Sequence, residues 1–409
     1  MTSGANLTLT PNASRARSAP SLDNLENLHL LILTPFFPSA ENSVYGTYIS
    51  EPIEGFAEFN LRSTVIAVSP LHHPRHSAAP NTAGEWLRYP MIPGNAGLTT
   101  AGLFLYRRVL SRVQQVHQRS PIHLIHAHAA LPCGHAASLL AEHWRIPFVV
   151  TIHGLDVFNA CFQPGTAAAK RRAKLSTDVY RRAASVICIS RKVQDILNQG
   201  MQPPRSCVIY NGTDPEVFCP AESASPNGTL NILMAGNLLR GKGQEIVFKA
   251  MAAVALQFPD LTCTLIGEGP DEQRFIDFAR ELGIAERVSF LGRRDRRAVA
   301  EAMRACTIFA LPSRFEGLGC AYLEAMACGK PVIACEGQGI AEIIRHRRNG
   351  WLIPVDGVAE MAETLRQLLS SPELRSSIGM NARQTIVDGL TLRDQVRHLN
   401  DLYREVIRV

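Results

Sequence analysis

The sequence predicts an α/β protein made of two doubly wound domains, each built around a parallel β-sheet. Short apolar runs rich in β-branched residues alternate with helical stretches along the chain, as expected for strands that are buried on both faces. The alternation is interrupted at 215–228, where three prolines and two serines indicate a linker. The chain has 409 residues, which is long for one domain and enough for two.

The first predicted domain extends from residue 29 to residue 215. Before it, residues 1–28 are rich in Ser, Asn, Ala and Thr and lack the apolar core of a signal peptide. We therefore expect a disordered tail on a protein that is not secreted. Within the domain, apolar runs predict strands at 29–34, 63–68, 123–127, 147–152 and 185–189.

The second predicted domain extends from residue 221 to residue 389. Its strands are expected where apolar runs resume after the linker. Ligands of doubly wound sheets bind beyond the carboxyl ends of the strands, so the loops that follow these runs are the first places to look for a site. The runs lie at 230–235, 262–266, 288–291, 307–311 and 331–334.

Composition narrows the class of protein. No run of about eighteen uncharged apolar residues occurs, so no transmembrane helix is predicted. The ten cysteines are scattered without a Cys-x-x-Cys pair, which indicates reduced thiols in the cytoplasm and no structural metal. Residues 1–220 contain 19 Lys and Arg against 13 Asp and Glu, whereas residues 221–409 contain 23 of each. The basic excess can attract phosphorylated substrates, anionic lipid or nucleic acid, although a solvated helix surface also explains it.

Two glycine-containing turns follow strands of the second domain. One is Gly236-Asn-Leu-Leu-Arg-Gly-Lys242-Gly243, and the other begins with Gly267. Glycines let a ligand approach the backbone closely, and a lysine beyond a strand end suits a phosphate group. Taken alone, the first turn is equally compatible with an ordinary Gly-rich turn, and for the turn at Gly267 a tight connection between a strand and a helix is the better explanation.

The segment 313–329 carries the most informative pattern. A loop with Glu316 leads into a short predicted helix at 320–327, whose N-terminus suits a pyrophosphate. Glu324 lies in that apolar helix without a neighbouring charge, so its carboxylate needs hydrogen-bond donors, which ribose hydroxyls can supply. Phosphate would repel Glu316, which therefore suits the hydroxyls of a donor sugar. The alternative is that Glu324 reaches solvent and Glu316 caps the helix.

Histidines follow two strands of the first domain. His126 and His128 come at the end of one predicted strand, and His153 and Asp156 follow the next one. A lone histidine is usually structural, but two sites at adjacent strand ends favour a role at a ligand site. Gly46 lies in the loop after the first strand, where it either admits a phosphate or acceptor or simply starts a helix.

Together these motifs resemble those of the retaining family 4 glycosyltransferases, which have the GT-B fold of two Rossmann-like domains facing a central cleft. The resemblance covers about residues 29 to 409, with several motifs in the same order. They are Ile209-Tyr-Asn-Gly-Thr-Asp214, Gly236 to Gly243, Leu265-Ile-Gly-Glu-Gly-Pro270, Phe290-Leu-Gly-Arg293, Glu316-x7-Glu324 followed by Ala-Met-Ala-Cys-Gly, Pro331-Val-Ile-Ala, Gly337-Gln-Gly-Ile-Ala-Glu-Ile-Ile and Asn349-Gly-Trp-Leu-Ile-Pro.

The resemblance implies that the second domain binds the donor. Lys242 would neutralise the diphosphate of a nucleotide sugar, Glu316 would orient the donor sugar, and Glu324 would hold the ribose. Backbone around Arg293 would contact the base. Further contacts to the donor are expected from the glycine turns and the start of the short helix, at Gly267, Gly317, Leu318 and Gly319.

The first domain would complete the site from across the cleft. The resemblance implies that His128 and His153 touch the donor sugar or its β-phosphate, with Asp156 beside them. The loop with Gly46 matches the glycine-bearing first loop of the family only in part. No catalytic triad or Cys-His pair competes with this interpretation.

One position departs from the family, which usually has Arg where this chain has Asn237. Either Arg240 reaches the phosphates in its place, or one cation fewer is enough. Asn237 also favours one alternative, a non-catalytic sugar-nucleotide binding protein. A sugar-nucleotide epimerase or hydrolase of the same fold is another alternative, but such enzymes generally need acidic acid–base residues in the cleft.

The resemblance implies retaining transfer of a hexose-type sugar from a UDP- or GDP-linked donor to a hydroxyl of a glycan or lipid-linked acceptor in surface polysaccharide biosynthesis. It implies no metal and no other cofactor, because protein cations stabilise the leaving diphosphate. The last helix, about 390–409, would cross back to the first domain, which would hold the acceptor. We expect a cytoplasmic enzyme that contacts the inner face of an anionic membrane and has no nucleic-acid partner.

Overall fold

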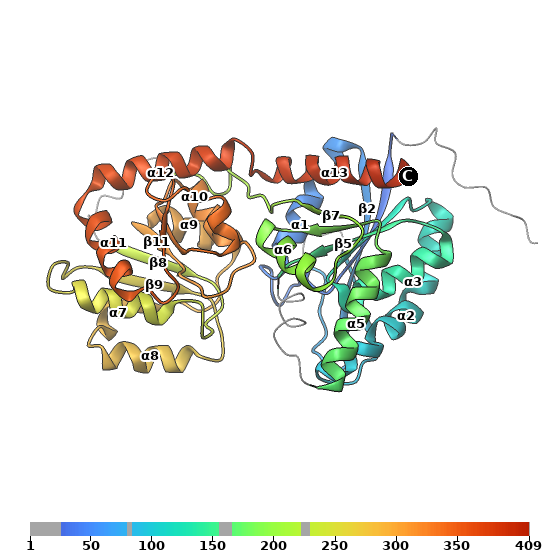
Figure 1. The fold of residues 1–409 in the computed structure, drawn as a ribbon, viewed down its shortest axis with the longest axis horizontal. Helices are drawn as coiled ribbons and strands as arrows, with labels where there is room; N and C mark the ends of the chain where they lie inside the picture. Colours follow the sequence, from blue (N-terminus) through green and yellow to red (C-terminus); the bar gives the residue numbers. More distant parts are fainter. Residues whose placement is uncertain (1–25, 80–83, 155–165, 222–229, 409) are drawn as a thin grey trace, which may run out of the picture.

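The computed structural model describes residues 26–79, 84–154, 166–221 and 230–408. They form two domains that lie side by side along the longest axis of the molecule, each with a sheet flanked by helices (Figure 1). All strand pairs within the two sheets are parallel. The predicted α/β fold of two doubly wound, Rossmann-like domains is therefore confirmed.

The first sheet has seven strands in the order β3-β2-β1-β4-β5-β6-β7. The order reverses between β1 and β4, and ligands of such sheets bind beyond this switch point. Sequence patterns missed β3 and β7, which are mostly half-buried and so lack a continuous apolar run. The strands are Leu28–Thr34 (β1), Leu61–Pro70 (β2), Gly84–Tyr89 (β3), Leu124–His128 (β4), Phe148–Ile152 (β5), Ser185–Cys188 (β6) and Ser206–Val208 (β7).

Strand β1 explains why the first sheet gives continuous apolar runs. All seven of its residues are buried, with Leu31 and Leu33 in one hydrophobic cluster and Leu30 and Ile32 in another. The first cluster includes α2, α3 and α5, and the second includes α1 and the C-terminal helix. The helices of this domain are Thr47–Glu54 (α1), Gly55–Phe59 (η2), Asn95–Gly97 (η3), Leu98–Arg119 (α2), Ala130–Gly134 (η4), His135–Trp144 (α3), Ala167–Arg182 (α5) and Arg191–Gly200 (α6).

The second sheet has six strands in the order β10-β9-β8-β11-β12-β13, with its own reversal between β8 and β11. Its strands are Asn231–Ala235 (β8), Thr262–Ile266 (β9), Val288–Phe290 (β10), Ile308–Ala310 (β11), Val332–Cys335 (β12) and Trp351–Ile353 (β13). The helices are Gln244–Val254 (α7), Glu272–Glu281 (α8), Ala285–Arg287 (η5), Arg296–Ala305 (α9), Cys320–Ala327 (α10), Gly339–Glu342 (η6), Val358–Ser370 (α11) and Pro372–Val387 (α12).

The C-terminal helix α13, Leu392–Arg408, lies against the first domain (Figure 1). Val396, Leu399, Tyr403 and Val406 are buried at the three- and four-residue spacing of one helix face, in the same cluster as residues of α1. Tyr403 is fully buried and reaches the site described below. The chain therefore crosses between the domains twice.

The predicted linker at 215–228 lies partly outside the described residues. Its described part is attached to the second domain, because Phe218 is fully buried and the Val217 carbonyl accepts a hydrogen bond from Arg304. Among the residues that the structure describes, no helix is both long and apolar enough to span a bilayer.

Candidate active site

Two glycine turns pack together beyond the carboxyl ends of β8 and β9. The Gly236 amide donates a hydrogen bond to the Ile266 carbonyl at 2.9 Å, and Gly267 has a φ of 140°. A Cβ at position 267 would lie 2.0 Å from the Gly236 carbonyl oxygen, so a side chain there would force the backbone to move. The turns thus present backbone that a ligand can approach closely.

Lys242 and Glu316 form an ion pair, with Lys242 Nζ 2.7 Å from Glu316 Oε2. Lys242 precedes α7, and Glu316 lies between β11 and α10. The Glu316 amide donates a hydrogen bond to Gln338 Oε1 at 3.0 Å, and its carbonyl accepts one from the Gly339 amide at 3.1 Å. Their side chains are 25% and 15% exposed, so a cation and a carboxylate are held side by side within reach of a ligand.

The loop after Glu316 ends at the N-terminus of α10. Gly319 has a φ of 85°, and a Cβ there would lie 2.6 Å from the Tyr322 ring, so a larger residue is excluded. Leu318 is fully buried and anchors the loop. No side chain caps α10, so the start of this helix, with its positive dipole end, remains available for an anion.

Glu324 is buried and pairs with Arg296, the first residue of α9. The same guanidinium contacts Glu51 of α1 with Nε–Oε1 and Nη2–Oε2 distances of 2.5 and 2.6 Å, and it lies 4.4 Å from the centroid of the Phe218 ring. The expectation that Glu324 lacks a neighbouring charge was therefore wrong. Its partner is close in space but 28 residues away in the chain.

The ionised form of Glu51 is disfavoured in this arrangement. Burial raises the pKa of its carboxyl from 4.5 to about 7, because desolvation and the charge of Glu324 outweigh the attraction of Arg296. One guanidinium thus serves two carboxylates from two domains. The sequence gives no signal for this contact, since 245 residues separate Arg296 from Glu51.

Three histidines stack at the carboxyl ends of β4 and β5. The ring centroids of His126 and His128 are 4.4 Å apart, and those of His128 and His153 are 5.1 Å apart. His128 Nδ1 lies 2.9 Å from His153 Nε2. The ring nitrogens of His126 lie 2.7 Å from the hydroxyls of Tyr403 and Thr151, so α13 helps to position the stack.

Burial keeps this stack uncharged near neutral pH. It lowers the pKa of His126 and of His153 from 6.5 to about 3, and His153 adds to the effect at His126. Burial also moves the pKa of His128 well below 6.5. A neutral imidazole has one donor and one acceptor, so the stack can exchange hydrogen bonds with a ligand without adding charge.

The histidines and the ion pair belong to one site. Ser190 Oγ, after β6, donates a hydrogen bond to the Gly317 carbonyl at 2.6 Å. A Cβ on Gly317 would lie 3.3 Å from the His153 carbonyl oxygen, so a side chain there would crowd the contact between the two domains. The loop with Glu316 therefore lies directly against the end of β5.

Glu342 joins the domains at a second place. Its carboxylate accepts hydrogen bonds from the amides of Arg191 and Lys192 at 2.9 and 2.7 Å, and from the Tyr210 hydroxyl at 2.9 Å. It thereby caps the N-terminus of α6, where the helix dipole favours an anion. Sequence reasoning also missed this contact, since a surface glutamate carries no mark of its partner.

Three other residues predicted to bind the donor are exposed or lie beside acidic residues of their own domain. Asn237 is exposed in the first turn. The Arg240 guanidinium is 71% exposed and lies 3.7 Å from Asp271, while Arg293 pairs with Glu268 at 2.9 Å. Both arginines therefore have acidic partners on their own domain.

On the first domain, Gly46 precedes α1 with a φ of 78°, and a Cβ there would lie 2.5 Å from the Phe36 backbone. Gly46 is thus required for the packing of its loop. Asp156 lies outside the described residues. Among the described residues, no group of three or more His, Cys, Asp or Glu has metal-binding geometry.

Comparisons with known families match both halves of the chain. A model described as "Glycosyltransferase Family 4" matches residues 46–217, and one described as "Glycosyl transferases group 1" matches residues 219–385. Together the two matches span nearly all of the two domains.

Individual proteins resemble the chain over most of its length. An uncharacterized glycosyltransferase of Methanocaldococcus jannaschii is 30% identical over 264 residues, which cover 64% of this chain and 70% of the relative. A D-inositol 3-phosphate glycosyltransferase of Jonesia denitrificans is 30% identical over 74% of this chain and 75% of its own. The structure of a sucrose-phosphate synthase from Thermosynechococcus elongatus superposes with a TM-score of 0.76 and 20% identity, covering 93% of this chain and 100% of that one.

Proposed function

The chain belongs to glycosyltransferase family 4 and has the GT-B fold, and on this premise we propose that it is a retaining hexosyltransferase. The donor would be a hexose-type sugar linked to UDP or GDP, and the acceptor would be a hydroxyl group. The observation that carries this proposal is the Lys242–Glu316 ion pair beside the uncapped start of α10.

A nucleotide sugar suits this arrangement. Lys242 and the first-turn amides of α10 are positive groups that match a diphosphate, and the glycine turns let the phosphates approach the backbone. When Lys242 turns to the phosphates, Glu316 is released to accept hydrogen bonds from the hexose hydroxyls. Glu324 likewise accepts hydrogen bonds from the ribose hydroxyls, and Arg296 then keeps its contact with Glu51.

Transfer in this site proceeds without an acid–base pair from the protein. The acceptor oxygen bonds to the anomeric carbon on the face from which the diphosphate departs, and the carbon–oxygen bond to the diphosphate breaks with its electron pair. The departing phosphate oxygen takes the proton of the acceptor hydroxyl. Lys242 and the α10 dipole stabilise the developing negative charge, and neutral His128 and His153 supply hydrogen bonds from the other domain. No metal is required for these steps.

The acceptor would lie against the first domain, and we propose a glycan or lipid-linked acceptor used in surface polysaccharide biosynthesis. The basic residues Lys170, Arg171, Arg172 and Lys174 of α5 give this domain a positive surface that suits the inner face of an anionic membrane. The Jonesia denitrificans relative is named for a small phosphorylated polyol, so small acceptors belong in the test.

The direct test is to incubate the full chain with UDP-glucose, UDP-N-acetylglucosamine and GDP-mannose, each with a panel of sugar and polyol acceptors. NMR of the product reports the configuration of the new bond from the one-bond carbon–proton coupling at the anomeric carbon. We expect an α-linked product from an α-linked donor, with the rate unchanged by EDTA. A β-linked product contradicts retention, and nucleotide release without any glycoside product favours the hydrolase alternative.

Glu316→Gln tests the site. The amide keeps the size of the side chain but loses the charge that holds Lys242 and accepts sugar hydroxyls, so kcat should fall about 10²–10³-fold. The control is Glu336→Gln, which removes an exposed carboxylate from the same domain and should leave kcat unchanged. Equal kcat for the wild type and Glu316→Gln would remove the assignment.

A further inference from the structure

A separate pocket lies in the first domain, beyond the carboxyl ends of β1 and β2 and beside β3. Its volume is about 570 Å³, which falls within the range of small-molecule sites. The loop after β1 contributes Phe36 and Tyr45 to the wall, and β3 contributes Trp86. The largest surfaces that a ligand meets there are aromatic rings.

Two polar atoms of residues that line this pocket have no hydrogen-bond partner among the described residues. They are Ser69 Oγ at the end of β2 and Asn42 Oδ1 in the loop after β1. His76 also lines the pocket, and its Nδ1 lies 4.0 Å from Glu41 Oε2. The Ser69 residue is 4% exposed. Buried polar groups are normally hydrogen-bonded, so two such atoms at one cavity indicate a ligand with hydroxyl groups.

The described residues that line the pocket include no Lys, Arg, Asp or Glu. Two charged side chains close to lining residues, Glu41 and Arg88, are already bound elsewhere. Glu41 accepts a hydrogen bond from the Ser77 hydroxyl at 2.5 Å, and the Arg88 guanidinium donates to the backbone carbonyls of Leu71 and His73. A phosphate in this pocket would therefore lack a cation to replace its hydration.

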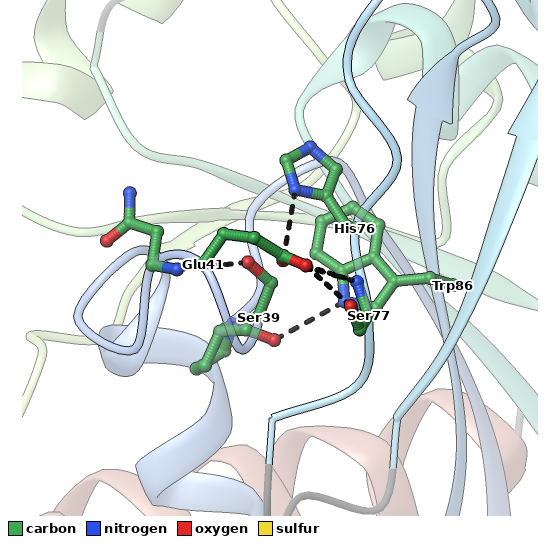
Figure 2. Close-up of polar contacts among 7 residues, drawn as sticks. Ser39, Glu41, His76, Ser77 and Trp86 are labelled. Carbon is green, nitrogen blue, oxygen red and sulfur yellow. Dashed lines mark hydrogen bonds and ion pairs between the residues drawn. The ribbon is translucent and has the colours of Figure 1, made fainter.

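Figure 2 shows how the wall is held in shape. Glu41 joins the loop after β1 to the segment with His76 and Ser77, and the His76 ring lies 4.5 Å from the Trp86 ring. The Trp86 indole N–H donates to the Pro38 carbonyl at 3.3 Å. These contacts fix the aromatic wall before any ligand arrives, which lowers the cost of binding.

The pocket adjoins the reaction centre. The Phe36 ring lies at the border, 6.0 Å from the ring of His153. His153 in turn lies against the loop with Gly317, where the donor sugar is placed under the proposed function. Under the proposed function, Phe36 is therefore the one aromatic side chain that a ligand in the pocket has to pass to bring a hydroxyl to the anomeric carbon of the donor sugar.

We propose that this pocket binds the acceptor as an uncharged sugar ring, with its apolar face on the aromatic wall and its hydroxyls on Ser69 and Asn42. This inference rests on the proposed function and narrows its acceptor to a neutral sugar unit. A phosphorylated sugar or polyol is disfavoured by the absence of a cation.

The test uses the full chain and ligand-observed NMR titrations at pH 8. The probes are the methyl glycosides of glucose, galactose, mannose and N-acetylglucosamine, and the corresponding sugar 6-phosphates. We expect at least one neutral glycoside to bind at least tenfold more tightly than its 6-phosphate. Equal or tighter binding of the phosphate would overturn the inference.

Ser69→Ala separates a ligand contact from a structural one. Removing a buried hydroxyl without a partner should preserve or raise the Tm of the protein, yet it should weaken glycoside binding about fivefold. Thr213→Val is the matched control, because Thr213 Oγ1 is also buried without a partner but does not line the pocket. Unchanged glycoside affinity in Ser69→Ala contradicts the proposal.

A charge added at the rim gives a gain-of-function test. Tyr45 is 43% exposed and lines the pocket, so Tyr45→Arg should improve binding of the 6-phosphates several-fold. Leu256→Arg adds the same charge at a fully exposed site on the other domain and should change nothing. If both variants change phosphate affinity equally, the pocket is not the binding site.

UDP and GDP titrations of the same samples separate the two proposals. If a nucleotide binds and no neutral glycoside does, the acceptor inference fails and the proposed function stands. If neither nucleotide binds the wild type, the donor assignment fails whatever the glycosides do.

Discussion

The two walls of the cleft hold their polar groups in opposite ways. The second-domain wall keeps full charges, in the Lys242–Glu316 pair and in the contact between Arg296 and Glu324. The first-domain wall keeps three histidines that burial holds neutral, with aromatic rings beside them. One wall suits an anionic ligand, and the other suits an uncharged one.

The difference teaches how each wall would work. Charged groups on the second domain are already paired. Under the proposed function, phosphate would therefore replace Glu316 as the partner of Lys242, and ribose would replace Arg296 as the partner of Glu324. Neutral groups on the first domain need no such exchange and are fixed by packing, for example by Tyr403 of α13. The donor wall is expected to respond to charge changes, and the other wall to changes of shape and hydrogen bonding.

The largest effect is expected from Lys242→Met, which keeps much of the length of the side chain and removes its charge. The diphosphate leaving group loses its main cation, so kcat/KM for the donor should fall about 10³-fold, or about 4 kcal/mol. Steady-state kinetics measure it. Lys249→Met is the control, because Lys249 is exposed on α7 and stacks on Phe278. A loss below tenfold in Lys242→Met would place the phosphates elsewhere.

The next effect concerns stability. The folded-state pKa of Glu51 is raised from 4.5 to about 7, so its contribution to stability is complete below pH 4.5 and is lost as pH rises through 7. This loss lowers the free energy of unfolding by about 3 kcal/mol. The substituted side chain in Glu51→Gln cannot ionise. Between pH 4.5 and pH 8, the free energy of unfolding of this variant should therefore rise by about 3 kcal/mol relative to that of the wild type.

Thermal or urea unfolding across this pH range measures the difference. Glu58→Gln serves as the control, since Glu58 is 59% exposed in its pair with Arg393. A constant difference between Glu51→Gln and the wild type at all pH values would show that Glu51 ionises normally.

Much of this contrast is readable in the sequence. Local patterns predicted ten of the parallel strands, the glycine turns, and the positions of Lys242, Glu316 and the histidines, because strand ends in such sheets meet along one edge. Glu51, Arg296 and Glu342 were missed. They are ordinary surface residues in sequence, and only the packing of one domain on the other brings each to its partner.

Strand β3 and helix α13 show the same limit within the fold. The half-buried β3 has no continuous apolar run, so its place at the sheet edge and in the pocket wall could not be predicted. The apolar face of α13 predicts an amphipathic helix, but not that Tyr403 would meet His126. Local periodicity indicates which residues are buried, and tertiary packing decides what they contact.

The role of the first-domain wall is tested by His153→Asn, which keeps a neutral hydrogen-bonding side chain. The rate should fall about tenfold, because the amide cannot reproduce the contact with His128. The folded-state pKa of His153 is depressed to about 3. The contribution of His153 to the stability of the protein is therefore complete above pH 6.5 and is lost as pH falls toward 3.

His153→Asn should therefore lose less stability than the wild type on acidification, by about 0.7 kcal/mol between pH 7 and pH 6. Unfolding curves at the two pH values test this. An identical acid sensitivity would mean that His153 takes up a proton as readily in the native protein as in the unfolded chain, so that burial does not hold this imidazole neutral.

The smallest effect is expected from Arg240→Ala. The side chain is 71% exposed and lies near Asp271, so donor KM should change less than about threefold. Asn237 then leaves the phosphates with Lys242 and the α10 amides alone. An increase in KM of tenfold or more would instead show that Arg240 replaces the arginine that the family usually has at position 237.

The most direct measurement of the division between the walls is a crossed binding experiment. UDP and the best neutral methyl glycoside are each titrated into the wild type, Lys242→Met and Ser69→Ala. Lys242→Met should weaken UDP at least tenfold and leave the glycoside unchanged, while Ser69→Ala should weaken the glycoside and leave UDP unchanged. Loss of both ligands in either variant, or UDP binding that is indifferent to Lys242, would contradict the account.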